Sequence, residues 1–173
     1  YPARGLDFRV AVPGQVYRVG PFEVEPVRVS HSIIEATALA IRTRAGTIVH
    51  TGDFKFDPAP PDGQPTDERR LEALGDSGVE LLLSDSTNIA SSTGLSGGAG
   101  SEATVAAALE ELIVRSPRRV VVGLFSSNIQ RLISLGQIAV RTGRKIGLLG
   151  RSLRGHVETA HDLGHLAWTE DLV

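Results

Sequence analysis

The spacing of apolar residues changes once along this chain, and the change separates two kinds of architecture. Before about residue 90, apolar and polar residues alternate, which is the pattern of half-buried strands. After about residue 100, short apolar runs alternate with longer amphipathic segments, which predicts strands and helices in turn. We therefore expect an α/β chain in two parts, with the boundary near residues 88–100, where residues 91–100 are rich in Ser and Gly.

The first part is predicted to consist mainly of strands. We expect them at residues 8–12, 22–29, 37–42, 47–50 and 79–83. Ala45-Gly46 predicts a hairpin between the third and fourth of these strands. A Pro-rich stretch at residues 57–65 indicates an irregular loop, and a short helix is expected from an N-cap at Thr66 to about Gly75.

The second part is predicted to alternate helices with strands. Helices are expected at residues 101–114, 128–141 and 152–163, and strands at 119–124 and 145–149. In the helix at residues 128–141 the apolar positions share one face, which leaves Arg131 and Arg141 for solvent. Those apolar positions are Ile129, Leu132, Ile133 and Ile138.

Two residue types are absent, and both absences bear on function. The 173 residues include no Cys, so disulfides and thiolate metal sites are excluded, and any metal must be held by His, Asp or Glu, as zinc and manganese can be. They include no Met, so we expect that Tyr1 is not the natural start and that the chain is a fragment. No apolar run approaches membrane-spanning length and no signal-peptide pattern opens the chain, so a cytoplasmic enzyme is the default expectation.

Charge is unevenly distributed although the net charge is only −2. Residues 53–111 hold twelve acidic and three basic residues, whereas residues 115–154 hold nine basic residues and no acidic one. One interpretation is a phosphate-binding surface beside an acidic metal centre. The other is a bias towards Arg together with one solvated basic face, and the sequence leaves both open.

His31 and Asp53 are the candidate metal-binding residues. Each follows a predicted strand, and the hairpin around Ala45-Gly46 brings the outer ends of its strands side by side. An imidazole and a carboxylate can therefore converge at one sheet edge, and Gly52 permits a tight turn just before the carboxylate. By spacing alone, however, a His and an Asp at strand ends are more often surface or capping residues.

Several short sequence motifs, in a fixed order, favour the metal-binding interpretation over surface or capping roles. They are Ser30-His31-Ser32-Ile33, His50-Thr-Gly-Asp53-Phe-Lys55, Leu82-Leu-Ser-Asp85-Ser-Thr-Asn88, Ser127-Asn128-Ile129, Gly143-Arg-Lys145 and Gly150-Arg-Ser152. Together they resemble the later motifs of the ribonuclease J group of β-CASP nucleases, which have a metallo-β-lactamase fold. The resemblance spans about residues 8–166.

The resemblance implies a fold and an activity. Residues 1–90 would be the C-terminal part of a metallo-β-lactamase αββα sandwich, and residues 91–173 the beginning of a β-CASP α/β domain. The parent protein would be a ribonuclease that cuts single-stranded RNA, as an endonuclease and a 5′-to-3′ exonuclease, in RNA processing and decay. It would use two Zn²⁺, with Mn²⁺ as a substitute, and form a cytoplasmic homo-oligomer, a dimer or tetramer, without a membrane.

The resemblance also assigns roles to residues. His31 matches a ligand of one zinc, Asp53 matches the aspartate that bridges both zincs, and Asp85 matches an acidic residue that orients a histidine. Ser127 and Asn128 lie at a strand-to-helix turn where a phosphate can bind, although a plain N-cap explains them equally well. Arg144, Lys145, Arg151 and Arg154 lie at element ends, and Arg144 and Arg151 are our candidates for RNA contacts.

Some features depart from the family pattern. The sequence contains no His-x-His-x-Asp-His word, so we expect the chain alone to be inactive and to hold no metal firmly. Gln130 stands where the family usually has His. We interpret His50 as a supporting or packing residue, and His156, His161 and His165 as surface residues. Two rivals stay open, a metallo-β-lactamase-fold hydrolase of a small molecule and a non-catalytic RNA-binding relative.

Overall fold

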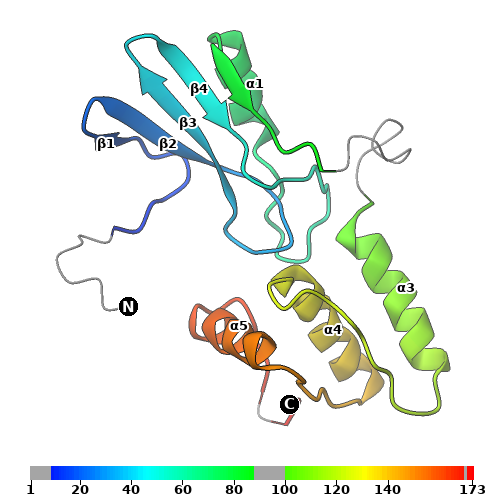
Figure 1. Cartoon of the computed structure of the whole chain (residues 1–173). Helices are drawn as coiled ribbons and strands as arrows, with labels where there is room; N and C mark the ends of the chain where they lie inside the picture. Colours follow the sequence, from blue (N-terminus) through cyan, green and yellow to red (C-terminus); the bar gives the residue numbers. More distant parts are fainter. Residues whose placement is uncertain (1–8, 88–99, 170) are drawn as a thin grey trace. The chain divides into compact units, whose positions relative to one another are not determined.

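A computed structural model describes residues 9–87, 100–169 and 171–173, which fall into two compact units (Figure 1). The first unit contains the chain up to Arg28, Thr37–Asp53 and Asp67–Asp85. The second contains Val29–Ala36, Phe54–Thr66 and the chain from Ser86 onwards. The predicted boundary at residues 90–91 and nearly all of the Ser/Gly-rich segment lie outside the described residues.

A five-stranded sheet in the order β1-β2-β3-β4-β5 forms the first unit. The strands are β1 (Tyr17–Val19), β2 (Phe22–Arg28), β3 (Thr37–Thr43), β4 (Gly46–His50) and β5 (Leu81–Leu83). Neighbours from β1 to β4 are antiparallel, and β4 with β5 is parallel. Four predicted strands are confirmed with small shifts at their ends. The prediction of a strand at residues 8–12 is wrong for residues 9–12, and β1 was missed because three residues give too little pattern.

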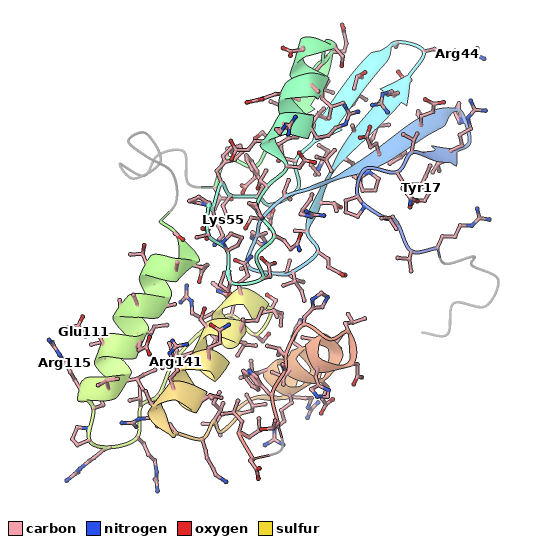
Figure 2. All side chains as sticks on the ribbon, turned by 180° about the vertical axis from the view of Figure 1, so that it is seen from behind. Tyr17, Arg44, Lys55, Glu111, Arg115 and Arg141 are labelled. Atoms are coloured by element: carbon pink, nitrogen blue, oxygen red, sulfur yellow. The ribbon has the colours of Figure 1, made fainter. Side chains whose placement is uncertain are left out.

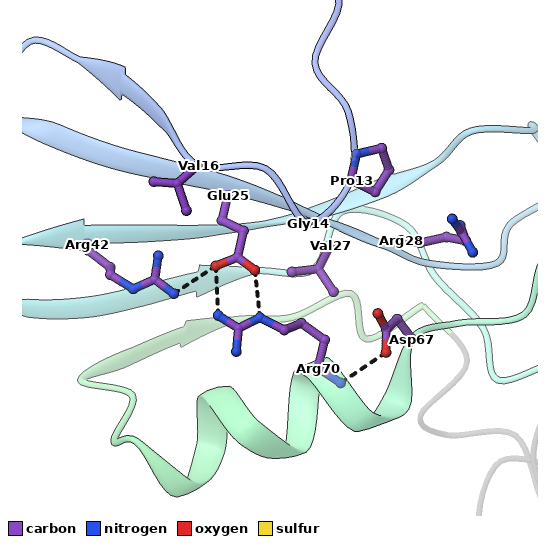
Figure 3. A pocket seen from close by; sticks show the side chains of 9 residues that line it. All are labelled: Pro13, Gly14, Val16, Glu25, Val27, Arg28, Arg42, Asp67 and Arg70. Carbon is purple, nitrogen blue, oxygen red and sulfur yellow. Dashed lines mark hydrogen bonds and ion pairs between the residues drawn. The ribbon is translucent and has the colours of Figure 1, made fainter.

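One face of this sheet is tightly packed because small residues alternate along its strands. Val27 lies opposite Ala38, and Ala40 lies opposite Val49, and all four are buried. Helix α1 (Glu68–Asp76) lies on the same side as Glu25 and Val27, and its Leu74 is buried (Figure 3). Alternation with a period of two thus gives the sheet one buried face.

A buried carboxylate ties α1 to the sheet. Glu25 of β2 accepts two hydrogen bonds from Arg70 of α1, at 2.6 and 2.8 Å, and one of 2.7 Å from Arg42 of β3 (Figure 3). The hydrogen bond from Arg70 is the main reason why the pKa of Glu25 is lowered to about 2; burial opposes it and Arg42 adds to it. These residues line a pocket of about 470 Å³.

The start of α1 differs from the prediction. Its N-cap is Asp67, whose side chain accepts from the Arg70 N–H at 3.0 Å. The predicted cap, Thr66, is buried and bonds to other segments instead, because its hydroxyl accepts from the Ser30 N–H and donates to the Lys55 carbonyl. The Thr66 hydroxyl is used by the distant Ser30 amide, and the next residue, Asp67, caps the helix instead.

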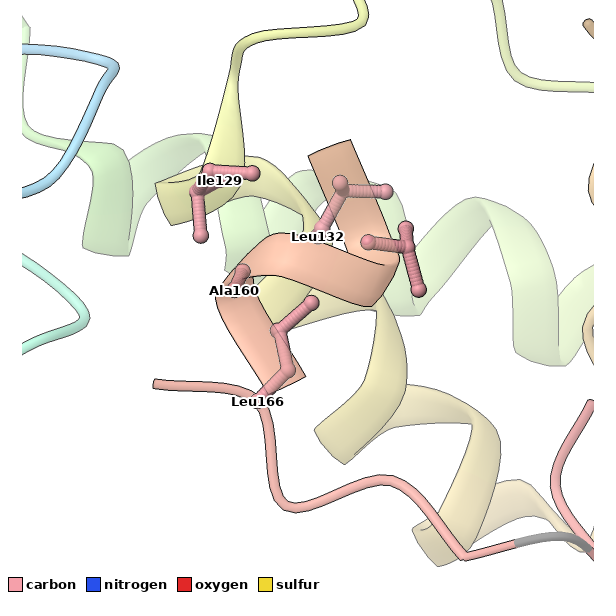
Figure 4. Close-up of a cluster of buried hydrophobic side chains, with 5 residues drawn as sticks. Ile129, Leu132, Ala160 and Leu166 are labelled. Carbon is pink, nitrogen blue, oxygen red and sulfur yellow. The ribbon is translucent and has the colours of Figure 1, made fainter. Parts of the chain in front are cut away.

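The second unit contains three helices in the described residues: α3 (Glu102–Arg115), α4 (Ile129–Thr142) and α5 (Arg151–Asp162). All three were predicted, including the N-cap at Ser101. Helices α4 and α5 share an apolar cluster to which α4 contributes Ile129 and Leu132 and α5 contributes Val157 and Ala160, together with Leu166 (Figure 4). The predicted apolar face of α4 is confirmed, with Ile138 also fully buried.

The two strands predicted in this unit do not form in the part of the chain that the structure describes. Residues 119–124 and 145–149 belong to no sheet there. Val121 and Leu149 are more than four-fifths exposed. A strand depends on hydrogen bonds to a neighbour, so apolar runs without a neighbouring strand do not become a sheet. The prediction of parallel α/β units is therefore wrong for this region, and the observed parallel pair is β4 with β5.

Charged side chains hold separate segments of the second unit together. Glu102, at the start of α3, accepts hydrogen bonds from Lys55 at 3.2 Å and from Arg131 at 2.9 Å (Lys55 is labelled in Figure 2). Asp57 accepts from the Glu102 N–H and from the Ser101 hydroxyl, both at 2.8 Å. Both carboxylates are almost fully buried, so this charge network is part of the core. No helix in the described residues is long and apolar enough to cross a membrane.

Candidate functional site

Asp53 and Asp85 lie beyond the carboxyl ends of the adjacent parallel strands β4 and β5. Thr51 joins these ends: its N–H donates to the Leu83 carbonyl at 2.9 Å, and its hydroxyl oxygen accepts from the Asp85 N–H at 3.0 Å. Asp53 is exposed and Asp85 is half-buried. The structure thus brings the two predicted acidic residues to the same edge of the sheet, where parallel strands commonly present functional groups.

Local geometry explains why His50 and Gly52 precede Asp53 in this motif. Gly52 has φ +59°, in the left-handed region that glycine adopts without strain, as its position before Asp53 predicted. A Cβ there would lie 3.4 Å from the Thr37 carbonyl oxygen. The Gly52 N–H donates to Nδ1 of His50 at 3.0 Å. His50 therefore supports the turn that presents Asp53, in agreement with its interpretation as a supporting residue.

His31 lies in the turn between β2 and β3, and this turn belongs to the second unit, whereas Asp53 belongs to the first. His31 is half-buried. The residue before it, Ser30, is fixed by a hydrogen bond from its N–H to Thr66 and by one that its carbonyl accepts from the Lys55 N–H. The main chain at His31 is therefore well anchored.

The described residues do not by themselves form the metal site that the resemblance implies. Among residues 9–87, 100–169 and 171–173, no three His, Asp or Glu side chains gather as a metal site requires. The predicted ligands His31 and Asp53 fall in different units.

Asn128 is the N-cap of α4. Its side chain accepts from the Arg131 N–H at 2.9 Å, and its carbonyl accepts from the Leu132 N–H. The remaining N–H groups of the first turn are also paired, Ile129 with the Ser127 carbonyl and Gln130 with the Ser32 carbonyl. The backbone donors that would attract a phosphate are thus already used, and only side chains of Ser127 and Asn128 remain for such a contact.

The two candidate arginines have different surroundings. The Arg144 guanidinium donates to the backbone carbonyls of Ile113, Ser116 and Arg118, so it secures the end of α3 and the following turn. Arg151 is exposed at the start of α5, and no side chain caps that helix. A helix N-terminus carries partial positive charge, which adds to that of Arg151.

Other basic residues are less free than predicted. Arg131 is not left to solvent, because it pairs with the buried Glu102. Arg141, which is labelled in Figure 2, is exposed but makes two hydrogen bonds of 2.8 Å to Glu110. His165 is half-buried rather than a surface residue, with its Nε2 3.2 Å from Oε1 of Glu35.

Sequence reasoning missed the charge network of Lys55, Asp57, Glu102 and Arg131. The available signal was Glu102, directly after the Ser101 cap, but an acidic residue there usually interacts with the positive end of the helix dipole. The partners lie 29 to 47 positions away along the sequence, so no local pattern could identify them.

Comparisons with known proteins agree with these motifs. Residues 117–173 match the family model of the ribonuclease J β-CASP domain. Ribonuclease J of Helicobacter pylori (strain ATCC 700392 / 26695) is 46% identical over 148 residues, covering 86% of this chain and 21% of that protein. Ribonuclease J of Mycobacterium tuberculosis (strain CDC 1551 / Oshkosh) is 45% identical over 153 residues, covering 88% of this chain and 27% of that protein.

A solved structure shares the fold. The crystal structure of a protein of unknown function from Enterococcus faecalis V583 superposes with a TM-score of 0.56 at 23% identity, covering 80% of this chain and 32% of that one. The chain spans about a fifth to a quarter of the length of the curated relatives it matches. The chain therefore belongs to the ribonuclease J-like β-CASP family.

Proposed function

We propose that this chain is part of a metal-dependent ribonuclease that cuts single-stranded RNA, both internally and from the 5′ end, in RNA processing and decay. The observation that carries the proposal is the pair Asp53 and Asp85, placed at one sheet edge and joined through Thr51, in a chain of the ribonuclease J-like family. Two carboxylates at the ends of neighbouring strands suit metal-assisted phosphodiester chemistry. The family comparisons do not favour a small-molecule hydrolase or a non-catalytic relative.

In this proposal His31 and Asp53 contribute two ligands to a site for two Zn²⁺, with Mn²⁺ as a substitute, that other parts of the whole protein complete. When bound, the metals would supply an activated water and neutralise charge on the phosphate. Asp85 would orient a histidine. The 173-residue chain by itself is expected to be inactive, since its sequence contains no His-x-His-x-Asp-His motif.

The second unit would guide the RNA. Ser127 and Asn128 would contact a phosphate through their side chains, since the first-turn amides of α4 are used internally. Arg151 would contact another phosphate with help from the uncapped N-terminus of α5. Arg144 is the weaker candidate, because its guanidinium already serves backbone carbonyls. Cytoplasmic location and assembly into a dimer or tetramer belong to the same proposal.

We also propose that the sheet is one layer of an αββα sandwich. The face away from α1 carries apolar residues that are only partly covered, among them Leu39, Ile41 and Ile48. The edge strand β5 exposes all three of its leucines. Uncovered apolar surface of this kind is expected where a second layer packs.

Metal content and cleavage in the whole protein test the proposal. Asp53→Ala should abolish cleavage and lower the zinc content measured by elemental analysis, because a shared carboxylate is lost. Asp85→Ala should reduce cleavage with a smaller loss of metal, since it acts through another residue. Asp76→Ala, an exposed carboxylate at the end of α1, is the charge-matched control. Full metal occupancy in Asp53→Ala would overturn the ligand assignment.

A further inference from the structure

The turn at residues 29–36 departs from the sheet that it connects. Its flanking strands β2 and β3 belong to the first unit, yet the turn itself belongs to the helical unit. Its hydrogen bonds follow that division: Ser30 is bonded to Thr66 and Lys55 of the second unit. The far end of the turn is held as well, because Oε1 of Glu35 lies 3.2 Å from Nε2 of His165. Glu35 has φ +59°, in the left-handed region.

Gln130 contacts this turn on both sides of His31. Its side-chain amide nitrogen donates to the Ser30 hydroxyl at 3.5 Å, and its backbone N–H donates to the Ser32 carbonyl at 3.2 Å. Gln130 is in the first turn of α4 and is 1% exposed, and Ser30 is 2% exposed. A single buried residue of the helix therefore holds the residue before His31 and the residue after it.

The side chain of Gln130 is poorly suited to a purely stabilising role. Its Oε1 is the buried side-chain atom without a hydrogen-bond partner among the described residues. An unpaired buried acceptor is unfavourable, and an apolar side chain of the same shape would avoid that cost. The favourable part of the side chain is thus its bond to Ser30, which acts on the turn.

We propose that Gln130 is a positioning residue that fixes the main chain on both sides of His31 and so holds the imidazole in one orientation. This rests on the proposed function, in which His31 is a metal ligand of the whole protein. The helical unit then sets the geometry of the ligand turn, and the sheet supplies only its two ends. The Ser30 contact is the side-chain component, and the Ser32 contact is the backbone component.

Nuclear magnetic resonance on the isotope-labelled 173-residue chain tests this without RNA or metal. Gln130→Met keeps the shape of the side chain and removes its polar atoms, including the unpaired acceptor. We expect the scalar couplings of His31, which report its χ1 angle, to change from one rotamer to an average. Amide exchange at Ser30 and Lys55 should accelerate roughly two- to tenfold, as for the loss of one net hydrogen bond. Thermal stability should not fall.

Two further variants sharpen the test. Gln130→His restores a ring N–H that can donate to Ser30, so the couplings of His31 should return to a single rotamer. Ser134→Ala removes a buried hydroxyl from the same face of α4 that bonds only the Gln130 carbonyl, and it should leave His31 unchanged. Unchanged couplings and exchange in folded Gln130→Met would overturn the proposal. So would a large loss of stability in that variant, which would make Gln130 a structural residue.

This outcome is independent of the proposed function. His31 can be ordered by Gln130 even if elemental analysis of the whole protein shows that it binds no metal. Conversely, a metal-binding His31 that stays ordered in Gln130→Met would leave the proposed function intact and remove the positioning role.

Discussion

The two units each bury carboxylates among cations, but they use them differently. In the sheet unit, backbone ladders already connect the strands, and Glu25 adds a link between α1 and two of them. In the helical unit, Asp57 and Glu102 join a loop to α3 and α4, segments that share no backbone ladder. Buried ion pairs therefore add to existing backbone contacts in the first unit, whereas they are a main connection between segments in the second. Removing a buried carboxylate should lower the free energy of unfolding more in the second unit.

The largest loss is expected for Glu102→Ala. Removing this carboxylate leaves Arg131 mostly buried without its counter-charge and Lys55 paired with Asp57 alone, which should cost about 3 kcal/mol of unfolding free energy. Urea unfolding followed by circular dichroism measures it. Glu111→Ala, which breaks an exposed pair with Arg115 on the same helix, should cost less than about 1 kcal/mol. Equal losses in both variants would remove the distinction between core and surface charge.

Glu25→Gln should cost somewhat less, about 2 kcal/mol at neutral pH, since Arg42 and Arg70 can still reach solvent. Because the pKa of Glu25 is lowered from 4.5 to about 2, its stabilisation is fully present above pH 4.5 and is lost as pH falls towards 2. The difference in unfolding free energy between wild type and Glu25→Gln should therefore shrink across that range. A difference that stays constant from pH 7 to pH 2 would contradict this.

Gly136→Ala probes the helical core without charge. Alanine favours helix, but its Cβ would overlap Nε1 of Trp168, so the indole must move. We expect a net loss of about 1 kcal/mol, because overpacking outweighs the gain in helix propensity. Trp168 is the single tryptophan, so its fluorescence should change in the folded state. A more stable variant with unchanged fluorescence would show that the indole of Trp168 leaves room for a methyl group at Gly136.

The smallest effects are expected for two arginines at the ends of elements. Arg144→Gln should destabilise the chain by about 1 kcal/mol, because backbone carbonyls lose their donor. Arg151→Gln should leave stability unchanged, but in the whole protein it should lower the salt dependence of RNA binding by about 0.7 units, the value for one phosphate of a single strand. If Arg151→Gln leaves the salt slope unaltered, Arg151 is outside the RNA path.

The sequence predicted correctly those turns and helix caps that depend only on adjacent residues. The hairpin at Ala45-Gly46, the cap at Ser101 and the left-handed Gly52 each depend on a few adjacent residues, and all three are present. The strands predicted at residues 119–124 and 145–149 required neighbours, which no apolar run can guarantee.

The candidate site shows the same limit. Asp53 and Asp85 reach one edge because β4 and β5 pair, whereas the strand pattern had predicted the approach of His31 and Asp53. The turn that carries His31 belongs to the helical unit because Ser30 is bonded to Thr66 and Gln130. These two residues lie 36 and 100 positions from Ser30 in the sequence. Contacts at such separations follow from the complete fold and leave no local signal.

In the proposed function, the sheet unit supplies chemistry through Asp53 and the helical unit guides RNA. Parallel measurement of cleavage rate and dissociation constant for labelled single-stranded RNA, with the whole protein and its Asp53→Ala and Arg151→Gln variants, tests it most directly. We predict that Asp53→Ala abolishes cleavage yet still binds RNA, and that Arg151→Gln weakens binding yet still cleaves at saturating RNA. If Asp53→Ala cleaves RNA at the wild-type rate, Asp53 takes no part in the chemistry.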